Sequence, residues 1–416
     1  MFSSYAKKSK VSLTFLINVL VFLFYTTLLI TQKSYNYASM ALAVIALFVV
    51  LYRLFYTKQR IPVYQYDKKI IYAFIAYFCT IALSVFITND GLREIDNPSR
   101  VLLFIPLILL FSTLPIKINT VLYAIPTGSA IIGLTAAIQI LILGQEKPFP
   151  DHMHIQAGNI SVTLAMMSLA ISIYWGIKKQ YNLMLMCFIC ASLGMLASAF
   201  SGARGGWVGL PAILAIILFF SYKNLNKKLT LGITFILSIM ISGIVISPKT
   251  NVLNRIQLAQ AEVINYFEHN ERSSSLGARF DMWNSAILGI QQKPLFGWGK
   301  NGYVELKRSQ LEQSIIAEGT LKFNDAHNQY LDTTVKRGAL GLLGLLAVIL
   351  IPLVYFISSI RNTSLEIKTV ALLGIIHIVS TLFFSTSQTF LAHNSGTVFY
   401  FVSVVILYGT IKSLKK

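Results

Sequence analysis

Three short motifs in this chain of 416 residues contain side chains that could do chemistry. Arg204 lies among glycines in Ser-Gly-Ala-Arg-Gly-Gly-Trp, Arg279 lies in Leu-Gly-Ala-Arg-Phe-Asp, and His327 lies in Asp-Ala-His-Asn. The planar guanidinium of arginine suits the oxygens of a phosphate. Histidine, whose ordinary pKa is close to neutrality, can take up or release a proton. These residue types could together bind an anion and move a proton.

Each motif also has a simpler, structural interpretation. Arg204 could snorkel to the membrane surface beside a close helix contact made by its glycines. Arg279 could form a surface salt bridge with Asp281 or Glu271. A single histidine such as His327 is more often structural than catalytic. The spacing within one motif does not decide between these interpretations.

The composition predicts a membrane protein. Hydrophobic residues make up 55% of the chain and charged residues only 12%, against roughly 25% charged residues in a soluble domain. So much apolar surface could not be hidden in a water-soluble core. This excludes a soluble enzyme, a disordered chain and a secreted disulfide scaffold.

The sequence offers little for a metal or a disulfide framework. The three cysteines lie inside or beside apolar runs, where they resemble small core residues. His152 and His154 are spaced as metal ligands can be, but no set of carboxylates or cysteines completes a site. We expect no metal site.

The apolar runs predict about twelve membrane-spanning helices, since one span needs about 20 apolar residues. The predicted spans cover residues 11–30, 38–55, 70–88, 101–114, 120–143, 158–177, 181–200, 205–221, 229–247, 338–358, 365–384 and 395–411. The fold class is therefore all-α, as an integral membrane protein.

The basic residues predict the orientation of these helices. Lysine and arginine outnumber aspartate and glutamate by 35 to 16, and they gather in short clusters between the apolar runs. If both termini are cytoplasmic, nineteen basic residues lie on that side and five in the short loops opposite, which follows the positive-inside rule. Because the clusters orient helices, the excess of charge does not indicate nucleic-acid binding.

One large hydrophilic segment, residues 248–337, interrupts the apolar pattern and is expected outside the cytoplasm. Amphipathic helices are predicted at 254–267 and 276–290, a turn-rich stretch at 291–303, and helical periodicity again at 325–335. The predicted organisation is spans one to nine in 1–247, a periplasmic loop domain in 248–337, and spans ten to twelve with a cytoplasmic tail in 338–416.

The distribution of carboxylates disfavours an ion-coupled transporter. No acidic residue lies between Asp151 and Glu262, and every acid falls in a loop or at the end of a predicted helix. Such transporters usually carry a carboxylate at membrane depth. A phosphate-binding P-loop motif is also absent from the sequence, which argues against direct nucleotide drive.

Taken together, the three motifs, their order and the predicted topology resemble the superfamily of O-antigen ligases and polymerases, and most closely the ligases. The resemblance covers nearly the whole chain. It matches Arg204 near the outer end of the eighth span, Arg279 in the loop, and His327 followed by Asn328 at the end of the loop. Where some ligases have His-x-His, this chain has Asp325-Ala-His327.

The resemblance implies a membrane glycosyltransferase of the lipid-linked-donor, or GT-C, type in the bacterial inner membrane. It would move a glycan from undecaprenyl diphosphate to a sugar hydroxyl of lipid A core. Arg204 and Arg279 would bind the diphosphate, His327 would act as base, and Asn328 would support it. The reaction would take place on the periplasmic side, and direct displacement would invert the anomeric centre. Because the outer loops carry no acidic cluster that would chelate a metal, we expect no divalent cation, nucleotide or other cofactor.

Two other functions remain open from the sequence. A polymerase of the same superfamily would use a lipid-linked sugar as its acceptor. A flippase or other transporter of lipid-linked oligosaccharides could hold a diphosphate in a cationic cavity without a base. The identities of the glycan, the acceptor sugar and any protein partner are not encoded in these motifs.

Overall fold

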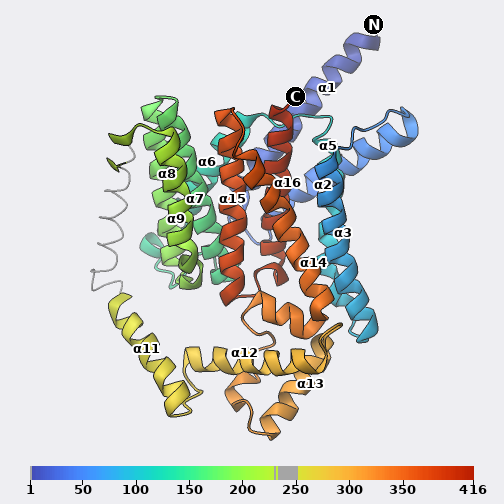
Figure 1. Ribbon diagram of the computed structural model, residues 1–416. Coiled ribbons are helices and arrows are strands. Elements are labelled where there is room, and N and C mark those ends of the chain that lie inside the picture. The colour runs from blue at the N-terminus through green and yellow to red at the C-terminus, as the bar shows by residue number, and fades with distance from the viewer. Residues whose placement is uncertain (1, 229–230, 233–251) are drawn as a thin grey trace.

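The computed structural model describes residues 2–228, 231–232 and 252–416. Every regular element in these ranges is a helix, and most of the helices form one bundle (Figure 1). In chain order the longer helices of the bundle are α1 (Phe2–Thr27), α2 (Tyr35–Leu51), α3 (Gln65–Ile87), α6 (Ile118–Ala137), α7 (His154–Ile177), α8 (Tyr181–Phe200), α9 (Leu210–Asn224), α14 (Gln329–Ser359), α15 (Leu365–Ser387) and α16 (Asn394–Leu414).

The described residues contain nine helical segments long and apolar enough to cross a membrane. They correspond to α2, α3, α6, α7, α8, α9, α14, α15 and α16, three of them extended by adjoining short helices. An apolar helix over Val11–Thr27, within α1, is a little shorter. The all-helical, membrane-spanning fold class is thereby confirmed.

The fourth predicted span, residues 101–114, is not one continuous helix. The chain forms α4 (Asp96–Leu103) and α5 (Ile105–Leu110), which are interrupted at Phe104. The stretch from α4 to Ile116, just after α5, still contacts α16 at two places. Asn97 Nδ2 donates to Thr397 Oγ1 at 3.0 Å at one end, and the Ile116 N–H donates to Ser413 Oγ at 3.0 Å at the other.

The ninth predicted span, residues 229–247, lies largely outside the described residues. The total of twelve spans therefore stays a prediction. Both ends of the chain lie at the same end of the bundle, which we call the terminal end (Figure 1). The opposite end, where α11–α13 lie, is called the loop end.

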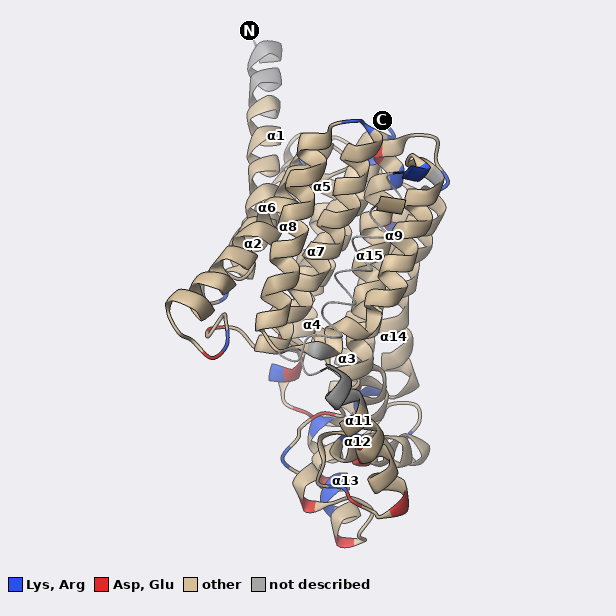
Figure 2. Ribbon diagram, turned by 90° about the vertical axis from the view of Figure 1, so that its left-hand side faces the viewer, with Lys and Arg blue, Asp and Glu red and all other residues tan. Residues whose placement is uncertain are grey.

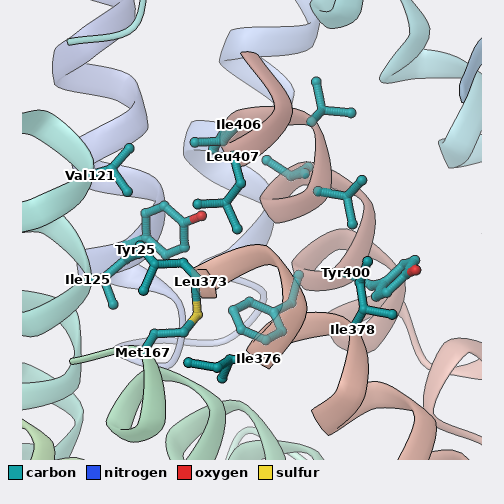
Figure 3. Packing of buried hydrophobic residues seen from close by; sticks show 14 of the residues in the cluster. Tyr25, Val121, Ile125, Met167, Leu373, Ile376, Ile378, Tyr400, Ile406 and Leu407 are labelled. Carbon is teal, nitrogen blue, oxygen red and sulfur yellow. The ribbon is translucent and has the colours of Figure 1, made fainter. Parts of the chain in front are cut away.

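The centre of the bundle is formed by α7, α15 and α16. Figure 3 shows how their side chains meet those of α1 and α6: Tyr25 lies between Val121 and Leu373, close to Met167. These side chains are almost entirely buried. Since lipid is as apolar as such side chains, the bundle depends on close packing for stability.

The helices at the loop end are α11 (Val252–Glu268), α12 (Ser275–Gln292) and α13 (Gly299–Glu312). The first two confirm the amphipathic helices predicted at 254–267 and 276–290. The third was missed, because the glycines around it predict turns. Figure 2 shows acidic and basic residues intermixed on this part of the chain.

A break in α14 fixes the loop helices to the bundle. Gly338 has a φ of 68°, and a Cβ there would lie 2.0 Å from the Leu295 carbonyl oxygen. The segment before α13 occupies the break: the Trp298 N–H donates to the Val335 carbonyl at 2.9 Å, and the Ala339 N–H donates to the Pro294 carbonyl at 2.7 Å. The interrupted backbone is thus satisfied by the loop.

Candidate active site

His327 lies immediately before α14, at the loop end of the bundle. Its backbone is in the left-handed region, with a φ of 46°, which is uncommon for a residue with a side chain. Asn328 is the N-cap of α14, and its Oδ1 accepts the N–H groups of Tyr330 at 3.0 Å and Leu331 at 3.2 Å. The structure therefore gives Asn328 a capping contact that fixes the helix start beside His327.

Asp325 holds His327 in place. Its Oδ1 accepts the His327 backbone N–H at 2.9 Å and lies 3.5 Å from the His327 Nδ1 atom. Its Oδ2 accepts the hydroxyl of Thr389, in the α15–α16 connection, at 3.3 Å. The imidazole also meets the edge of the Phe323 ring, with centroids 5.2 Å apart. Both side chains stay partly exposed, so a substrate could reach the imidazole.

A second histidine, His393, lies near the same groups. His393 lies between η6 (Phe390–Ala392) and α16. Burial lowers its pKa, while the nearby Asp325 carboxylate raises it and His327 lowers it further. His393 is therefore close to both groups. Because 66 residues separate His393 from His327, no local motif in the sequence connects the two histidines.

Lys307 holds Phe323, the residue that packs against His327. It is almost completely buried in α13, and its ammonium donates to the carbonyl of Phe323, the residue whose ring contacts His327. Burial and the neighbouring Lys336 lower the pKa of Lys307 to about 8, despite the opposing effect of nearby carboxylates. The hydrogen bond from Lys307 thus links α13 to the segment that carries His327.

A cavity of about 340 Å³ lies next to Asp325, where α3, α4, α13, α14 and η6 meet. Its lining contains both signs of charge, together with amide and hydroxyl groups. The charged residues are Arg93, Glu94, Lys300, Asp325, Asp332, Lys336 and Arg337. Such a mixture suits a polar ligand with many hydrogen-bonding groups better than an apolar one.

An ion-pair network closes one side of this cavity. Arg337 lies 2.8 Å from Asp90 and 3.3 Å from Glu94, and Lys300 lies 2.7 Å from Glu94. Asp90 also caps α13 from a distant part of the chain, because it accepts the N–H groups of Lys300 at 2.7 Å and Asn301 at 3.1 Å. Burial acts to raise the pKa of Asp90, but these hydrogen bonds and Arg337 outweigh it and leave the pKa below its ordinary value.

Arg279 does not form either of the salt bridges that the sequence offered. Asp281 is buried and instead contacts Arg272 at 3.8 Å, while Glu271 accepts a hydrogen bond from Asn265 at 2.8 Å. Within the described part of the chain, Arg279 makes no hydrogen bond or ion pair and is half-buried in the first turns of α12. Its guanidinium thus remains available to a ligand.

Arg204 begins the short helix η4 (Arg204–Gly209), and its side chain lies outside the described residues. The glycines after it allow close packing. A Cβ at Gly205 would lie 2.7 Å from Ser387 Oγ, and one at Gly209 would lie 2.8 Å from the Phe383 ring. The backbone of the Arg204 motif thus borders the last turns of α15, just before the connection in which Thr389 contacts Asp325.

The described residues contain no group of three or more histidine, cysteine, aspartate or glutamate side chains that could hold a metal ion. His152, one of the pair with ligand-like spacing, instead places its Nε2 atom 3.0 Å from the Thr31 carbonyl oxygen.

The bundle and its charged cavity define a multi-pass membrane protein with a polar site where the bundle meets the loop helices. The sequence profile of the family described as O-Antigen ligase matches residues 186–346, a range that contains Arg204, Arg279 and His327. An uncharacterized protein of Haemophilus influenzae is 48% identical over 395 residues, which cover 94% of this chain and 98% of the relative.

The chain belongs to the O-antigen ligase superfamily. This membership implies a ligase-like or glycosyltransferase-like activity in lipopolysaccharide biosynthesis, with lipid-linked substrates.

Proposed function

We propose that this protein is an O-antigen ligase that transfers a glycan from undecaprenyl diphosphate to a sugar hydroxyl of lipid A core. The observation that carries the proposal is His327, held by Asp325 beside a charged cavity and within the range matched by the family profile. An imidazole with a carboxylate at one nitrogen is the arrangement expected of a general base.

The proposed reaction occurs at the periplasmic face of the bacterial inner membrane, with both termini in the cytoplasm. The distribution of basic residues supports this orientation, because nineteen would lie in the cytoplasm against five in the short periplasmic loops. His327 and the loop helices would then face the periplasm.

The transfer is a direct displacement. The acceptor hydroxyl oxygen forms a bond to the anomeric carbon, while the bond from that carbon to the diphosphate oxygen breaks and its electron pair leaves with the diphosphate. The hydroxyl proton moves to His327, whose Nδ1 atom faces Asp325, so that Nε2 is the nitrogen left to receive it. Attack opposite the leaving group inverts the anomeric centre.

Arg204 and Arg279 are proposed to bind the diphosphate. A diphosphate is already a good leaving group, so the protein chiefly needs cations that hold it and neutralise the developing charge. Arginine does this through paired, directional N–H groups. The unpaired guanidinium of Arg279 supports its part of the proposal. Under this scheme the cations replace a metal ion, and no nucleotide or other cofactor is needed.

The cavity beside Asp325 is proposed to hold the acceptor sugar. Its carboxylates, amides and cations can donate to and accept from sugar hydroxyls, and its cations can also pair with phosphate groups on a core oligosaccharide. An acceptor in this cavity would present a hydroxyl near His327, since Asp325 belongs to both the cavity lining and the histidine contact.

The test is transfer by the purified protein in liposomes that contain lipid-linked donor and lipid A core in one leaflet. A single glycan added to the core supports the ligase. Lengthening of the lipid-linked glycan would indicate the polymerase instead, and movement of the donor between leaflets without any transfer would indicate a transporter.

A further inference from the structure

A second pocket, also of about 340 Å³, lies at the terminal end, between the start of α3 and the ends of α14 and α16. Four tyrosines and three lysines provide most of its lining, and none of the lining residues is acidic. It is separate from the candidate active site, because α16 has 21 residues and so holds the two about 30 Å apart.

Aromatic rings form one wall of this pocket, which we call the terminal pocket. The Tyr355 ring of α14 contacts Tyr66 with centroids 4.9 Å apart and Tyr408 of α16 with centroids 4.8 Å apart. Edge-to-face contacts on both sides fix the central ring, so three helices contribute to one rigid surface.

The carboxylate nearest this pocket is already neutralised. Asp67 is completely buried, and Lys412 Nζ lies 2.6 Å from each of its oxygens. Tyr408 also donates to Asp67 at 2.7 Å. Lys412 is therefore committed to the protein, and Asp67 does not repel an anion in the pocket.

At the mouth of the pocket, exposed lysines lie next to the tyrosine rings that line it. Lys415 is exposed, and its Nζ atom lies 5.1 Å from the centroid of Tyr355. Lys69 is also exposed, and its Nζ atom lies 4.8 Å from the centroid of Tyr66. The adjacent Tyr64 is 48% exposed and Val63 is 44% exposed. Apolar surface thus lies beside the charges, and Figure 2 shows basic residues gathered at this end.

We propose that the terminal pocket binds the phosphate of an anionic phospholipid in the leaflet at the terminal end. Basic pockets between helices at this level recognise anionic headgroups, and tyrosine and lysine side chains prefer the interface between lipid and water. Lys415 pairs with the phosphate, the tyrosine wall contacts the glycerol, and Val63 and Tyr64 contact the acyl chains. The apolar mouth favours a lipid over a soluble phosphate.

The test measures binding of phosphatidylglycerol to the delipidated full chain in detergent, by native mass spectrometry and by the rise in melting temperature. Phosphatidylglycerol should bind and raise the melting temperature, whereas phosphatidylcholine and inorganic phosphate should not. Lys415→Gln should weaken binding about fivefold, the typical effect of one lysine at a membrane surface. Lys415→Arg should keep it.

Lys117→Gln is the matched control, because it removes one exposed charge at the same end without touching the pocket. It should bind phosphatidylglycerol as the wild type does. Equal binding of phosphatidylcholine, tight binding of inorganic phosphate, or equal loss in Lys117→Gln and Lys415→Gln would each overturn the proposal. None of these measurements depends on glycan transfer, so they are independent of the proposed enzyme function.

Discussion

Replacing Asp90 with alanine should loosen the loop helices from the bundle. The side chain of Asp90 is 1% exposed and that of Arg337 is 9% exposed, so the substitution leaves a nearly buried guanidinium without its closest partner. Removing one member of a buried ion pair typically costs about 3 to 5 kcal/mol. Glu94 stays 3.3 Å from Arg337 and is 23% exposed, so Arg337 keeps one partner and the cost should lie at the lower end of this range. We expect a cost of about 3 kcal/mol, or roughly a hundredfold change in the equilibrium for loop release.

Hydrogen exchange at the amides of Trp298 and Ala339 measures this equilibrium. Both amides donate across the junction between the loop and α14, to carbonyl groups that the substitution leaves unchanged. Their protection should fall roughly a hundredfold in Asp90→Ala. Because a double mutant no longer contains the unpaired charge, Asp90→Ala combined with Arg337→Met should recover part of the loss.

Glu305→Ala is the matched control for this experiment. It removes a carboxylate from α13, the helix that Asp90 caps. The ion pair that it breaks is exposed on both sides, since the side chain of Glu305 is 67% exposed and that of Arg308 is 61% exposed. Exposed ion pairs contribute little to stability, so the protection of the Trp298 and Ala339 amides should change by less than about threefold. If Asp90→Ala left the exchange of Trp298 and Ala339 at the wild-type rate, the network would not be what holds the junction together.

Because hydrogen bonds and Arg337 lower the pKa of Asp90, its contribution to docking is present above the ordinary aspartate pKa of about 3.9 and is lost as the pH falls through the lowered value. Protection of the junction amides, corrected for the pH dependence of intrinsic exchange, should therefore fall below about pH 4 in wild type and stay flat in Asp90→Asn. If Arg279 grips the diphosphate, Arg279→Lys should lower transfer clearly and Arg279→Ala roughly a hundredfold, with the melting temperature as a check that both variants fold; wild-type transfer by Arg279→Lys would contradict a paired contact. Transfer should persist in excess chelator without nucleotide, and loss that added magnesium reverses would refute this. Reporter fusions should place Lys416 in the cytoplasm and Glu312 in the periplasm, and periplasmic activity after Lys416 would reverse the orientation.

The apolar spans were predictable because lipid imposes a simple requirement on sequence, namely a continuous run of about 20 apolar residues. The break between α4 and α5 was not predictable in this way. Phe104 is as apolar as its neighbours, but Pro106 lies in the first turn of α5, where its missing N–H and its ring prevent the helix before it from continuing. Hydropathy detects the run of residues but not the local break.

The candidate site was predictable only in part. His327 could be identified from its motif, whereas the contacts that position it come from distant segments, as with Thr389 on Asp325. The helix α13 was missed for a similar reason. Gly299 and its neighbours predict a turn, but Asp90 caps the helix from about 210 residues away. Interactions of this kind leave no local pattern in the sequence.

The most direct test of the proposed chemistry is His327→Ala, with donor binding, melting temperature and glycan transfer measured on the same purified protein. If His327 is the base, the variant should fold and bind the lipid-linked donor, while transfer falls by the roughly 10² to 10⁴-fold typical of lost acid–base catalysis. A stable His327→Ala protein that transfers glycan at nearly the wild-type rate would contradict the assignment.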